Sequence, residues 1–185
     1  MLHYFITKEE DQMKGIIAMC LKDLIVEKFG ADKWAQCLKN SGESQGVSIL
    51  ATSDMKDEVV LKMVQSVCAT LGISLQQAAD AFGEYWVCSF SRKIYPTYYI
   101  KYRNAREFLL GMDKVHVDTT NTLKDSHPPR FEYDWKDDKT LIMKYKSKRS
   151  LIDFAVGLAK GVGKHYKEDI TVTKLSDDKM QIVFP

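Results

Sequence analysis

The first half of the chain carries apolar residues at helical spacing. One apolar face of residues 14–29 consists of Ile17, Cys20, Leu21, Leu24 and Ile25, which predicts a buried helix that Gly30 ends in a left-handed conformation. A shorter helix is expected to end at Gly42, followed by a loop up to Asp54 and a further helix that ends at Gly72. The N-terminal part is therefore predicted to be helical.

Two more helices are predicted in the middle of the chain. A capping box opens at Ser74, and the apolar stripe behind it consists of Leu75, Ala79, Phe82, Trp86 and Phe90. After the interruption at Pro96, Asn104 caps a long helix that we expect to reach about Leu123. Its buried stripe consists of Phe108, Leu109, Met112, Val115, Thr119 and Leu123, and His116 lies on this stripe.

After Pro128 and Pro129 the period of the pattern changes from helical to alternating. "FEYDW" and "TLIMKYK" predict one hairpin around the turn "KDDK", and "ITVTKL" and "MQIVFP" predict a second around "SDDK". Between them, Ser150 and Asp153 cap a predicted helix whose inward residues are Leu151, Phe154, Ala155, Leu158 and Val162. The order of these elements predicts an α+β fold, with a helical N-terminal lobe followed by a long helix and an antiparallel ββαββ unit.

The strand "LIMKYKSKR" has two unlike faces. One face consists of Leu141, Met143, Tyr145, Ser147 and Arg149, and the other of Lys144, Lys146 and Lys148, most simply a solvated edge. A guanidinium turned toward the core keeps its charge and needs an anion, so the face with Arg149 is suited to carboxylates. The alternative is an ordinary ion pair between Arg149 and a surface Asp or Glu.

Composition narrows the possible classes of protein. The 185 residues are 45% hydrophobic with a net charge of +2, which fits one domain and gives no reason to expect nucleic acid as a partner. No leader peptide and no membrane span are expected, so no membrane partner is either. The four cysteines lack CxxC spacing, which favours free thiols and a cytoplasmic location.

His116 has two interpretations from its position alone. It is either a core histidine bonded to a carbonyl group or a metal ligand that acts without a second protein ligand. A single ligand favours a prosthetic group that brings its own equatorial donors, and haem also carries two propionates that Arg149 could hold. The two features together favour haem.

"FLLGMDKVH", "HPPR" and "YKSKR" resemble the haem nitric-oxide/oxygen-binding (H-NOX) family, bacterial relatives of the soluble guanylate cyclase sensor domain. The resemblance covers residues 13–185 and leaves 1–12 as an extension. It implies one domain, with a mainly helical lobe at 13–91, a lobe at 92–185 that holds the proximal helix and the sheet, and haem b (protoporphyrin IX iron) between the lobes.

The resemblance also implies roles for single residues. His116 is the expected proximal iron ligand, and Tyr145, Ser147 and Arg149 are the expected propionate clamp. The other expected haem contacts are Pro129, which presses on the porphyrin, and Ile17, Met112, Leu21, Trp86, Phe90, Phe154 and Leu158. Phe154 stands where oxygen-binding members of the family have a tyrosine, so we expect nitric oxide and carbon monoxide to bind but no stable oxygen complex.

The expected function is a non-enzymatic gas sensor. Nitric oxide would release the helix that holds His116, and because the chain ends at Pro185 without a cyclase segment, we expect it to regulate a separate histidine kinase or diguanylate cyclase. One alternative is a cofactor-free module that binds an anionic ligand or nucleic acid through residues 144–149. A haem peroxidase is disfavoured because the expected distal side has no His or Arg pair.

Overall fold

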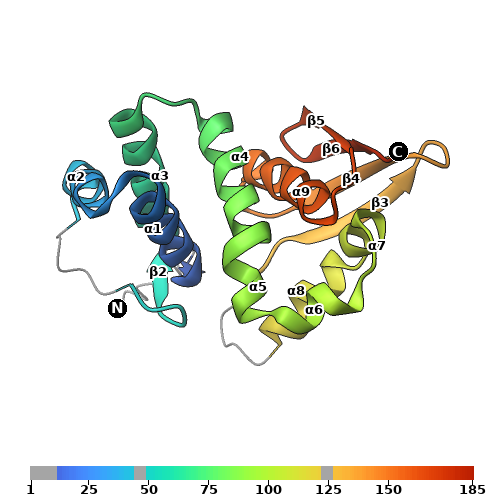
Figure 1. The fold of residues 1–185 in the computed structure, drawn as a ribbon, viewed down its shortest axis with the longest axis horizontal. Coiled ribbons are helices and arrows are strands. Elements are labelled where there is room, and N and C mark those ends of the chain that lie inside the picture. Colours follow the sequence, from blue (N-terminus) through green and yellow to red (C-terminus); the bar gives the residue numbers. More distant parts are fainter. Residues whose placement is uncertain (1–11, 44–48, 122–126) are drawn as a thin grey trace, which may run out of the picture.

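The computed structural model describes residues 12–43, 49–121 and 127–185. Helices of the N-terminal part pack together on one side of the molecule, and a four-stranded antiparallel sheet lies on the other (Figure 1). A long helical segment, composed of α4 (Leu75–Tyr85), a π-helical turn (Trp86–Phe90) and α5 (Ser91–Ile94), runs between them. The predicted α+β class is confirmed.

The described residues of the N-terminal lobe form three helices and a two-stranded sheet. Its elements are β1 (Gln12–Lys14), α1 (Ile16–Phe29), α2 (Ala31–Ser41), β2 (Asp54–Lys56) and α3 (Asp57–Leu71). Gly42 and Gly72 adopt the left-handed conformation expected at helix ends, whereas Gly30 has a positive φ but an extended ψ of 162°. The antiparallel pairing of β1 with β2 was not predicted, because three-residue strands are too short to show a period.

The helix predicted from Asn104 to Leu123 is two helices within the described residues. After α6 (Pro96–Lys101), α7 (Ala105–Leu110) and α8 (Met112–Thr120) meet at Gly111. A Cβ atom at Gly111 would lie 2.2 Å from the hydroxyl of Tyr102, so this glycine admits the tyrosine ring between the two helices. Leu123 itself lies outside the described residues.

The C-terminal lobe is a sheet covered by one helix. Its elements are β3 (Arg130–Trp135), β4 (Thr140–Lys146), α9 (Ile152–Tyr166), β5 (Thr171–Ser176) and β6 (Lys179–Val183), with the strand order β3-β4-β6-β5. Both predicted hairpins are confirmed. The lysine ladder is solvated as predicted, since the side chains of Lys144 and Lys146 are 41% and 59% exposed and pair with Glu132 on β3. It is not a sheet edge, because β4 is an interior strand.

Two local predictions were also wrong. Ser150 has a φ of 52° and does not cap α9, which begins after Leu151, and Asp153 instead accepts hydrogen bonds from Lys174 at 3.2 Å. Leu75 is 47% exposed rather than part of the buried stripe, because it is the first residue of α4. The capping box at Ser74 is present as predicted.

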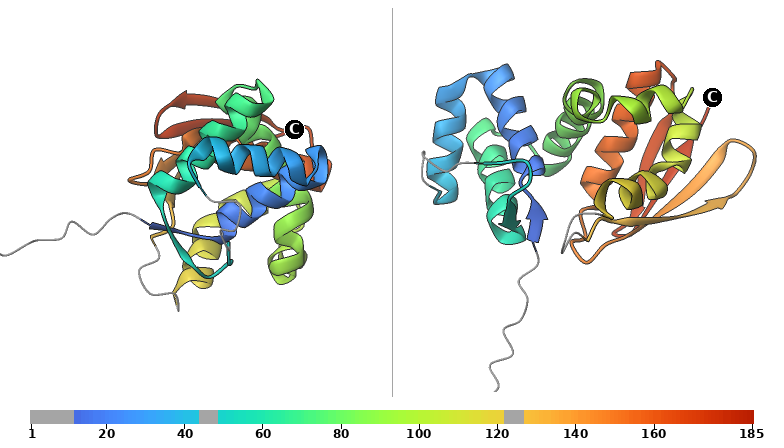
Figure 2. Two further views of the ribbon diagram at one scale, coloured as in Figure 1. Left: turned by 90° about the vertical axis from the view of Figure 1, so that its left-hand side faces the viewer. Right: turned by 90° about the horizontal axis from the view of Figure 1, so that it is seen from below.

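Helices α4 and α9 cross with their backbones in contact. A Cβ atom at Gly157 would lie 2.1 Å from the carbonyl oxygen of Ala79, and one at Gly161 would lie 2.5 Å from that of Gly83. Two ion pairs flank the crossing, Asp80 with Lys160 at 2.8 Å and Glu84 with Lys164. Figure 2 shows α9 between this segment and the sheet, so the crossing joins the two lobes.

Buried side chains form one core in each lobe, and Trp86 and Leu151 pack against both. Within the described residues, no helix is by itself long and apolar enough to cross a membrane. The helices Asp57–Leu71 and Leu75–Ile94 reach that length and apolarity only as a pair bent by 108°.

The α4–α9 crossing predicts that Gly157→Ala destabilises the protein. The added methyl group meets backbone atoms that cannot rotate away, so the helices must separate, at a cost of about 2 kcal/mol or more. The midpoint of thermal unfolding, followed by circular dichroism, should fall. Lys164→Ala on the same helix removes only an exposed ion pair and should leave the midpoint nearly unchanged; an equal midpoint for the two variants would contradict this account.

Candidate functional site

A mostly apolar cavity of about 610 Å³ lies between the two lobes. Most of the predicted site residues line it: Ile17, Leu21, Trp86, Met112, His116, Pro129, Tyr145, Arg149, Phe154 and Leu158. Ser147 and Phe90 do not; Phe90 packs behind Trp86, with ring centroids 5.5 Å apart. The volume suits a small organic ligand or a cofactor.

His116 projects from α8 and has one ring nitrogen engaged. Its Nδ1 lies 2.9 Å from the carbonyl oxygen of Pro129. Because a carbonyl oxygen only accepts, Nδ1 carries the proton and Nε2 carries the free lone pair. Burial lowers the pKa of His116, which keeps the ring neutral at pH 7. The lone pair of Nε2 is therefore available to coordinate a metal.

A carboxylate fixes the helix that carries His116. Asp113 accepts hydrogen bonds from Arg130 at 2.7 and 2.6 Å and from the backbone N–H of Phe131 at 2.9 Å. The Arg130 guanidinium and this N–H group hold the pKa of Asp113 down at about 2. Through these bonds β3 holds the first turn of α8, and α8 itself has no fully buried side chain.

The π-helical turn orients Trp86 on the cavity wall. The carbonyl oxygen of Trp86 accepts both the backbone N–H of Ser91 and, at 2.8 Å, its hydroxyl, where the helical hydrogen-bond pattern changes. The same hydroxyl lies 2.5 Å from the hydroxyl of Tyr99, another cavity residue. Through Ser91, the π-helical turn that follows α4 is therefore hydrogen-bonded to Tyr99 of α6.

The wall formed by α1, α4 and α9 is largely aromatic and aliphatic. Phe82 packs on Trp86 at 5.8 Å and edge-on against Phe154 at 5.4 Å. Leu21 and Leu158 complete the wall. Because leucine and phenylalanine side chains have no donor, the indole N–H of Trp86 is the one hydrogen-bond donor among these side chains. Tyr85 does not line the cavity, because its hydroxyl donates to Glu27 on α1 at 2.8 Å.

Arg149 lies where three segments meet at one edge of the cavity. Its Nε donates to Asp57 at 2.6 Å, one Nη to the carbonyl of Gln12 at 2.5 Å and the other to the carbonyl of His127 at 2.8 Å. The side chains of Arg149 and Asp57 are each 13% exposed, so the pair is partly buried rather than a surface ion pair. The other carboxylate oxygen of Asp57 is buried and has no hydrogen-bond partner among the described residues.

Tyr145 and Ser147 lie beside Arg149. Burial raises the pKa of the Tyr145 phenol, which Ser147 and Arg149 partly oppose, so Tyr145 keeps its proton and can donate. The Ser147 hydroxyl accepts from the backbone N–H of Arg149 at 3.2 Å. The three predicted clamp residues are thus close together, although Ser147 does not reach the cavity surface.

Several residues in or beside the cavity were not predicted. Asp57 was missed because its pairing with Arg149 joins residues 92 positions apart. Tyr95, Tyr98 and Tyr99 also line the cavity, and the dense tyrosines around Pro96 were the available signal. In the part of the chain that the structure describes, no group of three or more His, Cys, Asp or Glu side chains could hold a bare metal ion.

The chain is similar in sequence to proteins of known family. A family model described as haem-NO-binding matches residues 14–174. The chain is 25% identical over 166 residues to soluble guanylate cyclase gcy-32 of Caenorhabditis elegans, which covers 86% of this chain and 24% of that protein. The similar protein gcy-34 of the same organism is 26% identical over 157 residues, with 82% and 23% covered. The chain spans about a quarter of the length of these curated relatives.

Solved structures share the fold. An oxygen-binding H-NOX domain related to soluble guanylate cyclases, solved as its oxygen complex, superposes with a TM-score of 0.78 at 26% identity and covers 93% of this chain and 95% of its own. An H-NOX protein from S. oneidensis in the Fe(II)NO state gives a TM-score of 0.81 at 20% identity, with 92% and 98% covered. The second likeness concerns the fold alone.

The Asp113 anchor predicts a pH-dependent contribution to stability. Because the folded-state pKa of about 2 is below the ordinary value of 3.8, the contribution is present above pH 4 and is lost as the pH falls toward 2. Asp113→Asn should lower the free energy of unfolding at pH 7 by about 1 kcal/mol, since Arg130 is largely exposed.

Urea unfolding at pH 7 and at pH 3 measures both effects. Asp113→Asn should lose less stability than the native chain between these two pH values. Asp118→Asn, which alters a carboxylate paired with Lys114 on the same helix, is the matched control. If Asp113→Asn retained the full acid dependence of the native chain, the anchor would not be the source of it.

Proposed function

The chain belongs to the haem-NO-binding family, and on this premise we propose that it is a haem-based sensor of nitric oxide. The observation that carries the proposal is His116, a neutral cavity histidine whose Nδ1 is engaged by Pro129 and whose Nε2 is free to ligate. We assign a sensing rather than a catalytic role, because the cavity residues described include no distal His and Arg pair for acid–base chemistry.

The residues of the cavity fit a haem group. His116 supplies one axial donor, the walls are apolar, and the charge and hydroxyl groups of Arg149 and Tyr145 lie at one edge, where propionates need them. Arg149 is held there by Asp57 at 2.6 Å, so a bound propionate would have to share Arg149 with this carboxylate or displace it. No cysteine lines the cavity and the chain has no CxxCH sequence, which supports non-covalent haem b.

A bound haem supplies an iron atom that binds diatomic gases. Leu21, Phe82 and Phe154 supply no hydrogen-bond donor to the wall of α1, α4 and α9, and the one donor on it is the indole N–H of Trp86 rather than a tyrosine hydroxyl, the group expected at position 154 in oxygen-binding members of the family. Tyr85 is turned away to Glu27. This wall supports a protein that takes nitric oxide and carbon monoxide but holds oxygen poorly, in contrast to the similar oxygen-binding H-NOX domain.

The signal is proposed to leave the site through α8. The break at Gly111 separates α8 from α7, and its main anchors are Asp113 at its first turn and the bond from His116 to Pro129. A helix held by few contacts can move when the restraint on its central histidine changes.

The partner is proposed to be a separate histidine kinase or diguanylate cyclase in the cytoplasm, where free thiols such as the four cysteines persist. The guanylate cyclase relatives support coupling to a signalling enzyme. The alternative of an anion-binding module at residues 144–149 is weakened because Lys144 and Lys146 pair with Glu132 and Arg149 with Asp57.

His116→Gly tests the ligand assignment. The purified variant should lack the Soret absorption of the native protein, and added imidazole should restore it, because the glycine leaves room for a free ligand in place of the side chain. His165→Gly, a histidine that contacts Tyr99 and Tyr166, is the matched control. Full haem content in His116→Gly without imidazole would contradict the assignment, and a native protein that takes up no haem would contradict the proposed function.

Phe154→Tyr tests the basis of gas selectivity. The native ferrous protein should keep its absorption spectrum in air and change it with nitric oxide, whereas the variant should also respond to air because the new hydroxyl supplies a donor. Phe90→Tyr, which changes a ring outside the cavity, should behave as the native protein. A variant that ignores air would show that the shape of the wall, rather than the missing donor, excludes oxygen.

A further inference from the structure

Positive charge is concentrated in one segment of an otherwise balanced chain. Residues 85–106 contain Arg92, Lys93, Lys101, Arg103 and Arg106 but no Asp or Glu. The whole chain has 27 Lys and Arg residues, so the remaining 22 are outnumbered by the 25 Asp and Glu residues. The segment therefore creates a local positive potential that the net charge of +2 conceals.

Most of these cations have no internal counter-charge. Among the described residues, the charged side-chain nitrogens of Arg92, Lys93, Lys101 and Arg103 form no ion pair within 4.0 Å, although Glu107 accepts a hydrogen bond from the backbone N–H of Arg103 at 2.9 Å. By contrast, Lys160 and Lys164 on α9 both form ion pairs. Lys101 lies 5.1 Å from the ring of its neighbour Tyr102. Arg106 is excluded from this group, because it stacks between Trp135 and Phe184.

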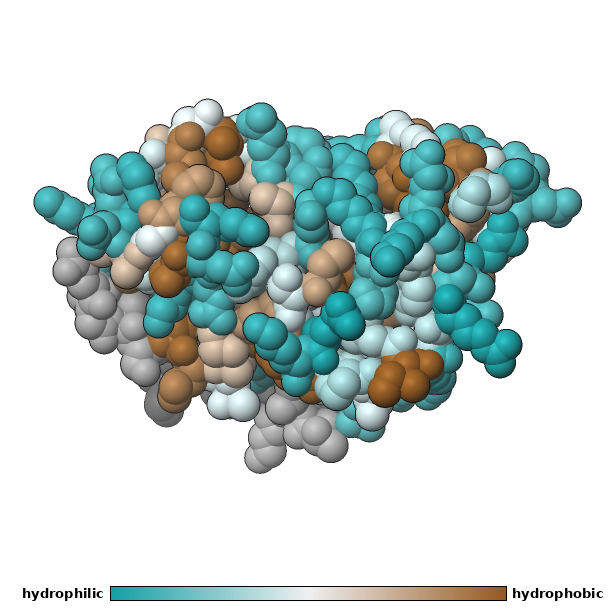
Figure 3. Space-filling model, in the orientation of Figure 1, coloured by the Kyte–Doolittle hydropathy of each residue, from teal (hydrophilic) through white to brown (hydrophobic). Residues whose placement is uncertain are grey.

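Exposed apolar side chains lie among these cations. Ile100 on α6 is 82% exposed and Ile94 on α5 is 41% exposed. Figure 3 shows a hydrophobic patch over α6 bordered by hydrophilic side chains. The α5–α6 surface, defined as Arg92, Lys93, Ile94, Ile100, Lys101 and Arg103, thus combines unpaired positive charge with apolar contact area.

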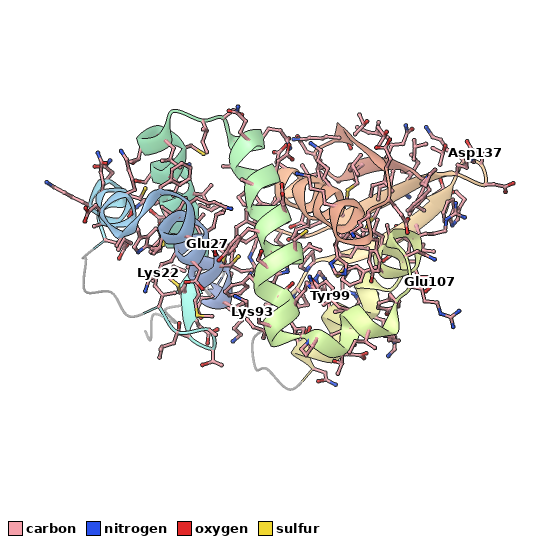
Figure 4. All side chains as sticks on the ribbon, in the orientation of Figure 1. Lys22, Glu27, Lys93, Tyr99, Glu107 and Asp137 are labelled. Carbon is pink, nitrogen blue, oxygen red and sulfur yellow. The ribbon has the colours of Figure 1, made fainter. Side chains whose placement is uncertain are left out.

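The aromatic residues of the segment do not belong to this surface. Tyr95, Tyr98 and Tyr99 line the cavity, and Tyr102 packs on Gly111. Lys93 and Tyr99 lie on opposite sides of the end of α5 (Figure 4). With its rings turned inward, the surface has no platform on which bases could stack, which disfavours nucleic acid. Two isoleucines on short helices are also too few to bury in a membrane surface.

The same helices contact the sensing cavity. Tyr99 of α6 lines the cavity and shares a hydrogen bond with Ser91, and Tyr102 at the end of α6 packs into the break that separates α7 from α8. Tyr102 therefore connects α6 to the break between α7 and the helix that carries His116. This link rests on the function proposed above.

We infer that the α5–α6 surface docks an acidic protein partner, one that presents carboxylates around an apolar side chain, as an acidic amphipathic helix does. The cations supply charge complementarity and Ile100 supplies the central apolar contact. An isoleucine exposed to this degree, on a segment whose cations form no ion pair among the described residues, has the composition of a docking site rather than of an ordinary surface.

A charge-reversal experiment tests the inference. The haem-loaded chain is titrated with three fluorescent probes: a synthetic amphipathic peptide of leucine and glutamate, duplex DNA, and vesicles of phosphatidylcholine with phosphatidylglycerol. The test variant carries Lys93→Glu, Lys101→Glu and Arg103→Glu. The control carries Lys22→Glu, Lys39→Glu and Lys139→Glu, which make the same charge change at exposed lysines elsewhere. Ile100→Ser is paired with Leu175→Ser, at a leucine that is 48% exposed on β5.

We expect the peptide to bind the native chain and the control variant, and to bind the test variant roughly tenfold more weakly. Ile100→Ser should weaken peptide binding more than Leu175→Ser does. The inference would be overturned if the peptide bound the two charge-reversed variants equally or did not bind the native chain. It would also be overturned if the test substitutions weakened the binding of DNA or of vesicles.

The response to nitric oxide is recorded on the same samples by absorption. A chain that binds the peptide but shows no haem or nitric oxide signal would contradict the proposed function and leave the docking surface in place. A normal nitric oxide response without peptide binding would overturn the docking surface alone.

Discussion

The contact between the backbones of α4 and α9 is the constraint on which the rest of the structure depends. Glycines at this crossing let the two helices approach until a methyl group would not fit, and this distance fixes how the helical lobe faces the sheet lobe. Phe82 and Trp86 project from one helix and Phe154 and Leu158 from the other, so the same distance sets the width of the cavity wall. A close crossing also explains why the wall can be both large and well packed.

Each polar group of the site is positioned by a second group. The carbonyl of Pro129 fixes the tautomer of His116, Asp113 fixes α8 against β3, and Asp57 together with two backbone carbonyls holds Arg149. The Arg149 contacts come from both lobes, because Gln12 and Asp57 belong to the N-terminal one. An anion that drew Arg149 toward the cavity would therefore also alter a contact between the lobes, which links cofactor binding to the arrangement of the fold.

The sequence predicted the features that depend on local pattern. Amphipathic period located the helices and hairpins. The strand predicted to run to Arg149 ends at Lys146, so Ser147 and Arg149 lie near Tyr145 through the turn that follows β4 and not through strand phase. Features set by contacts between distant segments were not accessible: the partner of Arg149, the break at Gly111 that Tyr102 occupies, and the pairing of β1 with β2. Ser150 is a case in which the local pattern misled. Serine is a favourable capping residue, but the turn that joins β4 to α9 gives Ser150 a positive φ, so it does not cap the helix. The roles given to the cavity residues remain predictions.

The break at Gly111 makes α8 a short lever. At 1.5 Å per residue, His116 lies about 7 Å from this pivot, and the last residue of the helix, Thr120, lies about 13 Å from it. A rotation of α8 about Gly111 is therefore nearly doubled in amplitude between the histidine and the far end. Asp113 lies only two residues from Gly111. Its bonds to β3 therefore resist translation of the helix, but they oppose a rotation about Gly111 only weakly, because they act close to the pivot. A displacement of about 0.3 Å at His116 would therefore become about 0.5 Å at the far end of α8.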